Sequence, residues 1–203
     1  MGGGMRSNAL LVLCLAAIQL AGAAGCGSAP VGQAWPEAAS QAPLPGENEQ
    51  ARLKDALTGG QMTPREVAEM SDRLLADSST FNDQKTMARL ELLLLMAIKS
   101  PDKSAHAALW RSLGILHYHQ QKYKEARQEL QTSNEINPKS ARTHFYLARL
   151  FTHQGEIYES QGQKGKSRQQ FKRAAIEMEQ ARKIEPGNPL FRQDVKQVIG
   201  GNR

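Results

Sequence analysis

The sequence predicts an all-α fold, and three observations support that prediction. Residues that favour strands are scarce: valine occurs five times in 203 residues, whereas Ala, Leu, Lys, Arg, Glu and Gln are abundant. Apolar residues recur at spacings of three and four, as in Val67, Met70 and Leu74. Helix-start signals, such as the pattern of residues 63–66, and helix-ending prolines frame these runs.

Length and composition limit the class of protein. A chain of 203 residues with 40% hydrophobic residues can bury one core of ordinary size and still carry appendages. Two cysteines cannot form a disulfide framework. A charged fraction of 23% beside this apolar content is not the composition of a disordered chain.

Residues 1–25 have the pattern of an export signal. Arg6 precedes an apolar stretch from Ala9 to Ile18, and small residues then lead to Cys26. The stretch falls short of the roughly 20 apolar residues that span a membrane, so a removed signal is favoured over a retained anchor.

Ala23-Ala24-Gly25-Cys26 resembles the lipobox of bacterial lipoproteins, with Ala23 where leucine is more usual. The resemblance implies that Cys26 carries acyl chains such as palmitate, which anchor a domain because each buried methylene contributes about 0.8 kcal/mol. Gly27 follows in place of Asp, which in a Gram-negative source implies the outer membrane, facing the periplasm. The alternative is ordinary signal cleavage that leaves Cys26 as a free thiol.

Residues 26–50 are predicted to be a tether. Prolines, which extend a chain and remove hydrogen-bond donors, are concentrated in it: Pro30, Pro36, Pro43 and Pro45. Its one large apolar residue, Trp35, is either an anchor for a partner or an incidental aromatic residue.

Start and stop signals place the first helices of the folded part. A helix from Glu47 to Leu57 is expected to end at Gly59-Gly60. The next helix opens with a capping box, because Thr63 and Glu66 can each bond the other's backbone N–H, and Pro64 needs no N–H in the first turn.

A hairpin is expected over residues 63–100, with its second helix running from after Thr80 to about Lys99. The residues expected to be buried in that helix are Met87, Leu90, Leu93, Leu94 and Ile98. The block from Leu92 to Met96 is apolar almost all round, which predicts neighbours on both sides of the helix.

Residues 107–140 carry a repeat pattern made of Trp110, Leu113, Gly114, Tyr123, Ala126 and Pro138. This pattern resembles a tetratricopeptide repeat (TPR), a pair of antiparallel helices, in which the small residues Gly114 and Ala126 let the two helices approach closely. His117 departs from the family pattern, since an aromatic residue is usual there.

The pattern starts again at Ala141, which is 34 residues after Ala107, with Leu147, Ala148, Phe171, Ala174 and Pro186. Pro138 and Pro186 are 48 residues apart, so this second unit, residues 141–188, carries 14 extra residues. Fourteen residues form about four helical turns, which can lengthen both helices equally.

The resemblance therefore implies a long hairpin, Ala141 to about Gln161 and Lys166 to Lys183. A capping helix is expected at 189–199, to cover the last apolar face. Together with the less regular hairpin of residues 63–100, these units make residues 51–203 an all-α domain of TPR-like antiparallel helical hairpins, stacked as a short solenoid.

Catalytic or metal-binding chemistry is not expected. His117 and His119 lie two residues apart, so a helix points them to different sides, and no cysteine or carboxylate completes a set with His106, His144 or His153. No nucleophile triad or phosphate-binding loop occurs. The sequence predicts no enzyme, no metal and no cofactor, and a metal carrier or enzyme is a remote alternative.

The resemblance implies a concave groove lined by the first helix of each pair. The groove residues implied by register are Arg111, Ile115, Tyr118, His119, Arg142, Phe145, Arg149, Thr152 and His153. Arginines beside aromatic rings could hold an acidic peptide or helix of a partner protein. The alternative is a solvated helix face whose long side chains cover apolar neighbours.

A second basic cluster near the tip of the long hairpin consists of Lys164, Lys166, Arg168, Lys172 and Arg173. It could meet anionic lipid, or it is a solvated charged face. Nucleic acid is not expected as a partner of an exported protein.

The resemblance suggests a membrane-anchored scaffold lipoprotein in envelope complex assembly, such as a pilotin-like factor for a pilus or secretion system. An adaptor that regulates cell-wall enzymes is the alternative. No pattern in the sequence predicts the partner's identity, the pathway or the oligomeric state.

Overall fold

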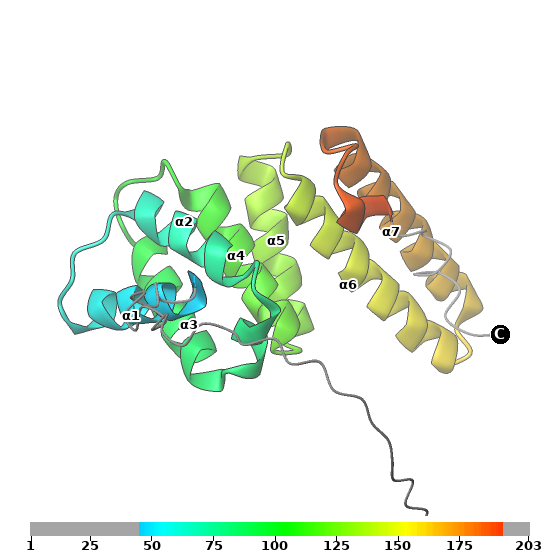
Figure 1. Ribbon diagram of the computed structural model, residues 1–203. Helices are drawn as coiled ribbons and strands as arrows, with labels where there is room; N and C mark the ends of the chain where they lie inside the picture. The colour runs from blue at the N-terminus through cyan, green and yellow to red at the C-terminus, as the bar shows by residue number, and fades with distance from the viewer. Residues whose placement is uncertain (1–44, 193–203) are drawn as a thin grey trace, which may run out of the picture. The chain divides into compact units, whose positions relative to one another are not determined.

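The computed structural model describes residues 45–192. The predicted signal, Cys26, most of the tether with Trp35, and residues 193–199 of the predicted capping helix lie outside the described residues. Over the described range the chain is all-α, as the sequence predicts, and that range contains no β-strand (Figure 1).

Seven α-helices and two short 3₁₀ helices follow one another in the described residues. They are α1 (Pro45–Thr58), α2 (Pro64–Leu74), η1 (Ser78–Asn82), α3 (Gln84–Ile98), α4 (His106–His119), α5 (Tyr123–Ile136), α6 (Ala141–Ser160), α7 (Lys164–Ile184) and η2 (Pro189–Arg192). None of the helices in this part of the chain is long and apolar enough to cross a membrane.

Short polar side chains begin several of these helices. Thr63 accepts a hydrogen bond from the Glu66 N–H, and the Glu66 carboxylate accepts one from the Thr63 N–H at 2.8 Å, which confirms the predicted capping box. Asp77 caps η1 and Asp83 caps α3. The predicted helix after Thr80 therefore begins later, at Gln84 and after η1, because Asp83 starts it by bonding the N–H groups of the first turn.

Adjacent helices pack as antiparallel pairs, α4 with α5 and α6 with α7 (Figure 1). The second pair is the longer one, with 20 and 21 residues in its helices against 14 and 14 in the first. These lengths confirm the prediction that the second hairpin is lengthened, and α7 starts two residues earlier than expected.

The earlier helices pack on the first pair. α2 and α3 pack against α4, and α1 packs against α3.

A glycine lies at the contact between the two helices of each pair, α4 with α5 and α6 with α7. A Cβ atom on Gly114 of α4 would lie 2.7 Å from Leu130 Cγ and 3.1 Å from the Ala126 carbonyl oxygen of α5. A Cβ atom on Gly155 of α6 would lie 2.6 Å from the Phe171 ring of α7. Since real Cβ atoms keep a larger distance, a side chain at either position would force its neighbour on the paired helix to shift.

The repeat-pattern residues fall into three groups. Leu113, Gly114, Ala126, Leu147, Ala148 and Ala174 are buried, Trp110, Tyr123 and Phe171 are half-buried, and Pro138 and Pro186 are exposed just beyond the ends of α5 and α7. The small and apolar members thus pack between helices, and the prolines follow helix ends, where a missing N–H is harmless.

The C-terminal end of the described core is closed by η2. Phe191 is buried against Ala141, Phe145, Met178 and Ala181. The Arg182 Nε–H donates to the Phe191 carbonyl oxygen at 2.7 Å, which fixes η2 on α7.

One expectation about α3 is wrong. Leu92 is 52% exposed and Met96 55% exposed, although the apolar block predicts neighbours on both sides of the helix. Among the described residues, α1, α2 and α4 pack only against the face that carries Leu90, Leu94 and Ala97. Ile98 is half-buried.

Candidate protein-binding site

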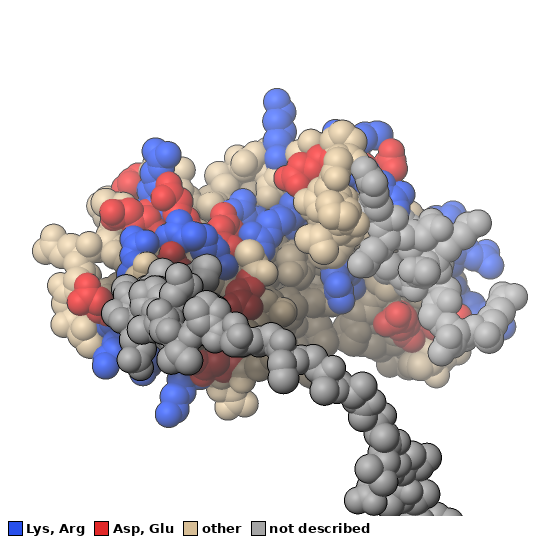
Figure 2. Space-filling view, in the orientation of Figure 1, with Lys and Arg blue, Asp and Glu red and all other residues tan. Residues whose placement is uncertain are grey.

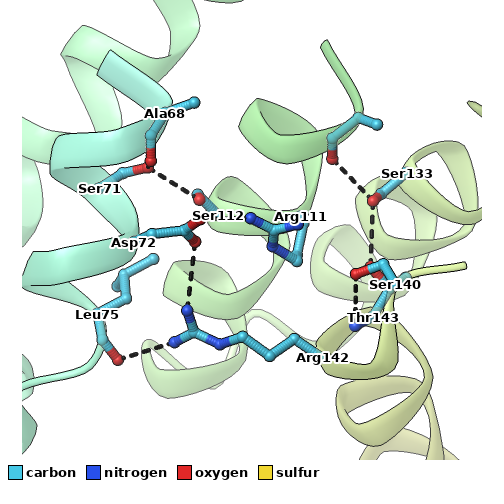
Figure 3. A network of polar contacts seen from close by, with 11 residues as sticks. Ala68, Ser71, Asp72, Leu75, Arg111, Ser112, Ser133, Ser140, Arg142 and Thr143 are labelled. Atoms are coloured by element: carbon cyan, nitrogen blue, oxygen red, sulfur yellow. Dashed lines mark hydrogen bonds and ion pairs between the residues drawn. The ribbon is translucent and has the colours of Figure 1, made fainter. Parts of the chain in front are cut away.

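Two of the three predicted groove arginines already bind a carboxylate of the same chain. Arg111 on α4 and Arg142 on α6 both face Asp72 on α2, with 2.6 Å and 3.2 Å between side-chain nitrogen and oxygen (Figure 3). Arg142 also donates to the Leu75 carbonyl oxygen at 3.3 Å. The two guanidinium groups are thus occupied by a carboxylate of α2, a helix of the chain itself.

α2 is a permanent part of the core. It buries Val67, Met70 and Leu74 almost completely. Exposing these three side chains would cost roughly 5 kcal/mol or more, since each large buried apolar side chain contributes about 1.5–3 kcal/mol. A partner therefore cannot readily displace α2 from the arginines, and this part of the predicted groove is closed.

Acidic and basic side chains also pair on the outer side of α1 and α2. Arg73 of α2 lies 2.7 Å from Glu49 of α1, and Arg65 lies 3.1 Å from Glu69 one helical turn further on. Both charges are found side by side over these helices in the space-filling view (Figure 2). Exposed pairs of this kind contribute little each, roughly 0–1 kcal/mol.

Buried hydroxyl groups join the helices on either side of the Asp72 contact, from Ser71 on α2 to Ser133 on α5 (Figure 3). The Ser71 and Ser112 hydroxyl oxygens are 2.9 Å apart between α2 and α4, and both side chains are buried. Ser133 of α5 donates to the Ala107 carbonyl oxygen at 2.8 Å and lies 3.2 Å from the Thr143 hydroxyl of α6. Because buried hydroxyls are costly when unpaired, these bonds fix how the helices meet.

Three predicted groove residues do not reach the surface. Ile115 is fully buried at 0% exposure, and Phe145 and Thr152 are also buried. The prediction that they line an open groove is therefore wrong. Ile115 belongs to the main core, Phe145 packs on Phe191, and the Thr152 hydroxyl donates to the Ala148 carbonyl oxygen of its own helix.

His119 is covered as well. Its ring stacks on Phe81 of η1, with 3.5 Å between ring centroids and 14° between planes. Its Nε2 lies 3.3 Å from the Tyr146 hydroxyl. Burial, and to a smaller extent the positive charge of Arg149, lowers the pKa of His119 to about 4. The imidazole is therefore neutral near pH 7 and acts as an aromatic surface.

Arg149 remains open to a partner. It is exposed, and its Nε–H donates to the Tyr118 hydroxyl at 2.9 Å. The guanidinium carbon lies 5.3 Å from the Tyr118 ring centroid and 5.7 Å from that of Phe145. No carboxylate pairs with it among the described residues, so its charge is held in place but not neutralised.

His153, the last predicted groove residue, packs on Tyr123 of α5, with 4.1 Å between ring centroids. Of the predicted groove, the structure thus leaves Tyr118, Arg149 and His153 accessible.

Two further histidines are structural, and both have raised pKa values. Burial opposes a charge on His117, but hydrogen bonds to Glu129 at 2.7 Å and Glu91 at 3.1 Å outweigh it and raise the His117 pKa. A hydrogen bond to Glu177 at 2.6 Å outweighs burial and raises the His144 pKa. Each ring places both of its nitrogens against acceptor oxygens, which favours the protonated form, and each joins neighbouring helices.

Residues 45–192 contain no group of three or more His, Cys, Asp or Glu side chains placed to hold one ion. His117 and His119 point to different neighbours, the first to Glu91 and Glu129 and the second to Phe81.

A basic cleft between α5, α6 and α7 shares only His153 with the predicted groove. It brings Arg127 of α5 and Arg173 of α7 to the ring of Phe151 of α6. Only Arg173 stands out in the sequence, as a member of the predicted second basic cluster. Arg127 and Phe151 are 24 residues apart and share no periodic pattern, so the packing of α5 on α6 was needed to find them.

The class that the fold defines is an all-α protein built from antiparallel helix pairs. In comparisons with known proteins, no protein-family model and no curated protein sequence matches the chain.

Proposed function

We propose that this chain is an envelope-anchored adaptor of TPR-like hairpins that binds another protein through the accessible part of α4 and α6. The observation that carries the proposal is Arg149, an exposed guanidinium that is fixed over Tyr118 and Phe145 and lacks a carboxylate among the described residues. A fixed cation over aromatic rings suits an acidic side chain followed by an apolar one.

The contact between Asp72 and the two other arginines supports the same chemistry. It is an internal example of an acidic helix seated on arginines of α4 and α6. A partner helix or peptide that carries carboxylates would extend this pattern along α6 to Arg149. The partner is therefore expected to be acidic at its contact site.

Anchoring through lipid on Cys26 is the second part of the proposal. It rests on the lipobox resemblance, and it places the adaptor at the outer membrane, facing the periplasm, in a Gram-negative source. Assembly of a pilus or secretion complex is the corresponding pathway, and gene neighbours of that kind, as opposed to cell-wall enzymes, would support it.

The binding test is affinity capture from the native host with Arg149→Gln beside Arg65→Gln, an exposed control on α2. The expected result is one stoichiometric partner that is retained by the control and lost by Arg149→Gln, with helical circular dichroism unchanged in both. Equal capture by the two variants would contradict the proposed surface.

The anchoring test is fractionation of cells that carry Cys26→Ser. The unchanged protein should sediment with membranes and the variant should not. If the variant stays with the membranes, lipidation at Cys26 is not the anchor.

A further inference from the structure

The basic cleft is a second surface of unusual charge. Two adjoining hollows, of about 440 Å³ and about 310 Å³, share Arg127 and Phe151 and so form one cleft. We define the basic cleft by Lys124 and Arg127 of α5, Phe151 of α6, and Arg173, Ile176 and Glu177 of α7.

Two guanidinium groups share one aromatic ring in this cleft. The guanidinium carbons of Arg127 and Arg173 lie 5.3 Å and 5.9 Å from the ring centroid of Phe151. Phe151 itself is only 7% exposed, so the ring forms the floor and the guanidinium groups form the walls.

These cations are not neutralised within the described part of the chain. Neither Arg127 nor Arg173 has a carboxylate within ion-pair distance there, and the acidic residue at the edge, Glu177, is engaged by His144 at 2.6 Å. Residues 160–176 include five basic residues and no acidic one. Like charges that meet at one ring repel each other, and an anion between them would remove that cost.

The cleft also offers an apolar seat. Ile176 is 60% exposed and lines the same hollow as Arg173. A carboxylate between two guanidinium forks, with an apolar group beside it, describes an acidic peptide better than a flat lipid surface, because the charges line a hollow.

We propose that the basic cleft binds an acidic segment of a protein partner, with a carboxylate between Arg127 and Arg173 and an apolar side chain on Ile176. The cleft is a different surface from that of Arg149, since Arg149 and Phe151 are two residues apart on α6 and point to opposite sides of the helix. The chain thereby offers two separate contacts for acidic segments, and this second contact does not depend on the proposed function.

The test uses the purified, lipid-free chain carrying Cys26→Ser. The probe is a fluorescent peptide in which glutamate alternates with phenylalanine, and its matched control has glutamine in place of glutamate. We expect the acidic peptide to bind and the double variant Arg127→Gln/Arg173→Gln to weaken binding at least about tenfold, the usual effect of losing charge-assisted hydrogen bonds.

Two control proteins make the result specific. Arg89→Gln/Lys99→Gln removes the same charge from exposed positions on α3 and just after its end, and should change binding by less than about twofold. Because Arg149 is itself proposed to hold an acidic segment, the comparison is repeated in an Arg149→Gln background, where the loss caused by Arg127→Gln/Arg173→Gln should persist. A loss of binding in Arg149→Gln alone would place the peptide on the other surface and overturn the proposal for the cleft.

A nuclear magnetic resonance titration locates the contact directly. The Phe151 ring protons and the Arg127 and Arg173 Nε–H signals should shift on addition of the acidic peptide. Equal binding of the glutamine peptide, unshifted Phe151 signals, or binding only to phosphatidylglycerol vesicles and not to the peptide would each overturn the proposal.

Discussion

Arg111 and Arg142 converge on a carboxylate, whereas Arg127 and Arg173 converge on an aromatic ring with no carboxylate among the described residues. The first pair connects three helices and is part of the fold. The second pair stands at a cleft and forms no ion pair between helices of the described range. Residue type is the same in both places, so the role of an arginine here depends on whether another element supplies its counter-charge.

The largest expected effect is that of Asp72→Ala. Removing this carboxylate leaves Arg111 and Arg142 without their ion-pair partner at a half-buried site, and we expect the free energy of unfolding to fall by about 2 kcal/mol. Urea denaturation measures the change. Glu69→Ala, which breaks an exposed pair with Arg65, is the matched control and should cost less than about 0.5 kcal/mol.

Equal losses in Asp72→Ala and Glu69→Ala would remove the distinction between the two arginine pairs. In that case the contact of Arg111 and Arg142 would be an incidental surface feature.

Ser71→Ala should have the next largest effect. It leaves the Ser112 hydroxyl buried without its neighbour, which we expect to cost about 1 kcal/mol. The double variant Ser71→Ala/Ser112→Ala should be no less stable than the single one, since no hydroxyl is then left unpaired. A double-mutant cycle by urea denaturation checks this, and strictly additive losses would contradict the coupling of α2 to α4 through this bond.

The paired region should also respond to pH, through His117. Its pKa is raised above 6.5 by Glu129 and Glu91, against burial, so its contribution to stability is complete below pH 6.5 and is lost as the pH rises through the raised value. His119, whose pKa is about 4, adds nothing to the change above pH 6.5. Because arginine does not titrate there, the basic cleft should keep its affinity for the acidic peptide.

Urea midpoints measured from pH 6.5 upward test this difference, because below pH 6.5 the lowered pKa of His119 makes stability rise with pH. The unchanged protein should lose stability with rising pH, and His117→Gln should lose less, with the remaining slope due to His144, whose pKa is raised in the same direction. Parallel curves for the two proteins would show that His117 is not protonated in the fold.

The smallest expected effect is that of Arg127→Gln/Arg173→Gln on stability. Neither arginine has an ion pair to lose among the described residues, and each loses only a cation–π contact with Phe151. We expect the free energy of unfolding to change by less than about 1 kcal/mol. A loss as large as that of Asp72→Ala would mean that both arginine pairs stabilise the fold.

Local signals in the sequence were sufficient for much of the fold. The capping box of Thr63 and Glu66 depends on residues three apart, and Gly114 occurs in a pattern confined to one hairpin. The all-α class follows from propensity and spacing along the chain. Such features can be predicted from the sequence because the interacting residues are close together along the chain.

The surface was harder to predict because distant elements cover it. Asp72 is 39 residues from Arg111 and 70 from Arg142, and no periodic pattern relates the three. Register shows that Ile115 and His119 share a helix with Arg111, but not that Phe81 or α2 packs over that helix. A repeat pattern predicts which residues share one face of a helix. Whether that face is accessible depends on which other elements, here α2 and η1, pack over it.

Phe191 bears on how binding data for this chain should be interpreted. It supports the ring of Phe145, with 5.3 Å between ring centroids, and that ring in turn lies under the guanidinium of Arg149. A smaller residue at position 191 would let this support shift and would weaken capture of a partner that never meets it. A genetic screen that maps contacts by loss of binding would therefore return residue 191 as a false contact.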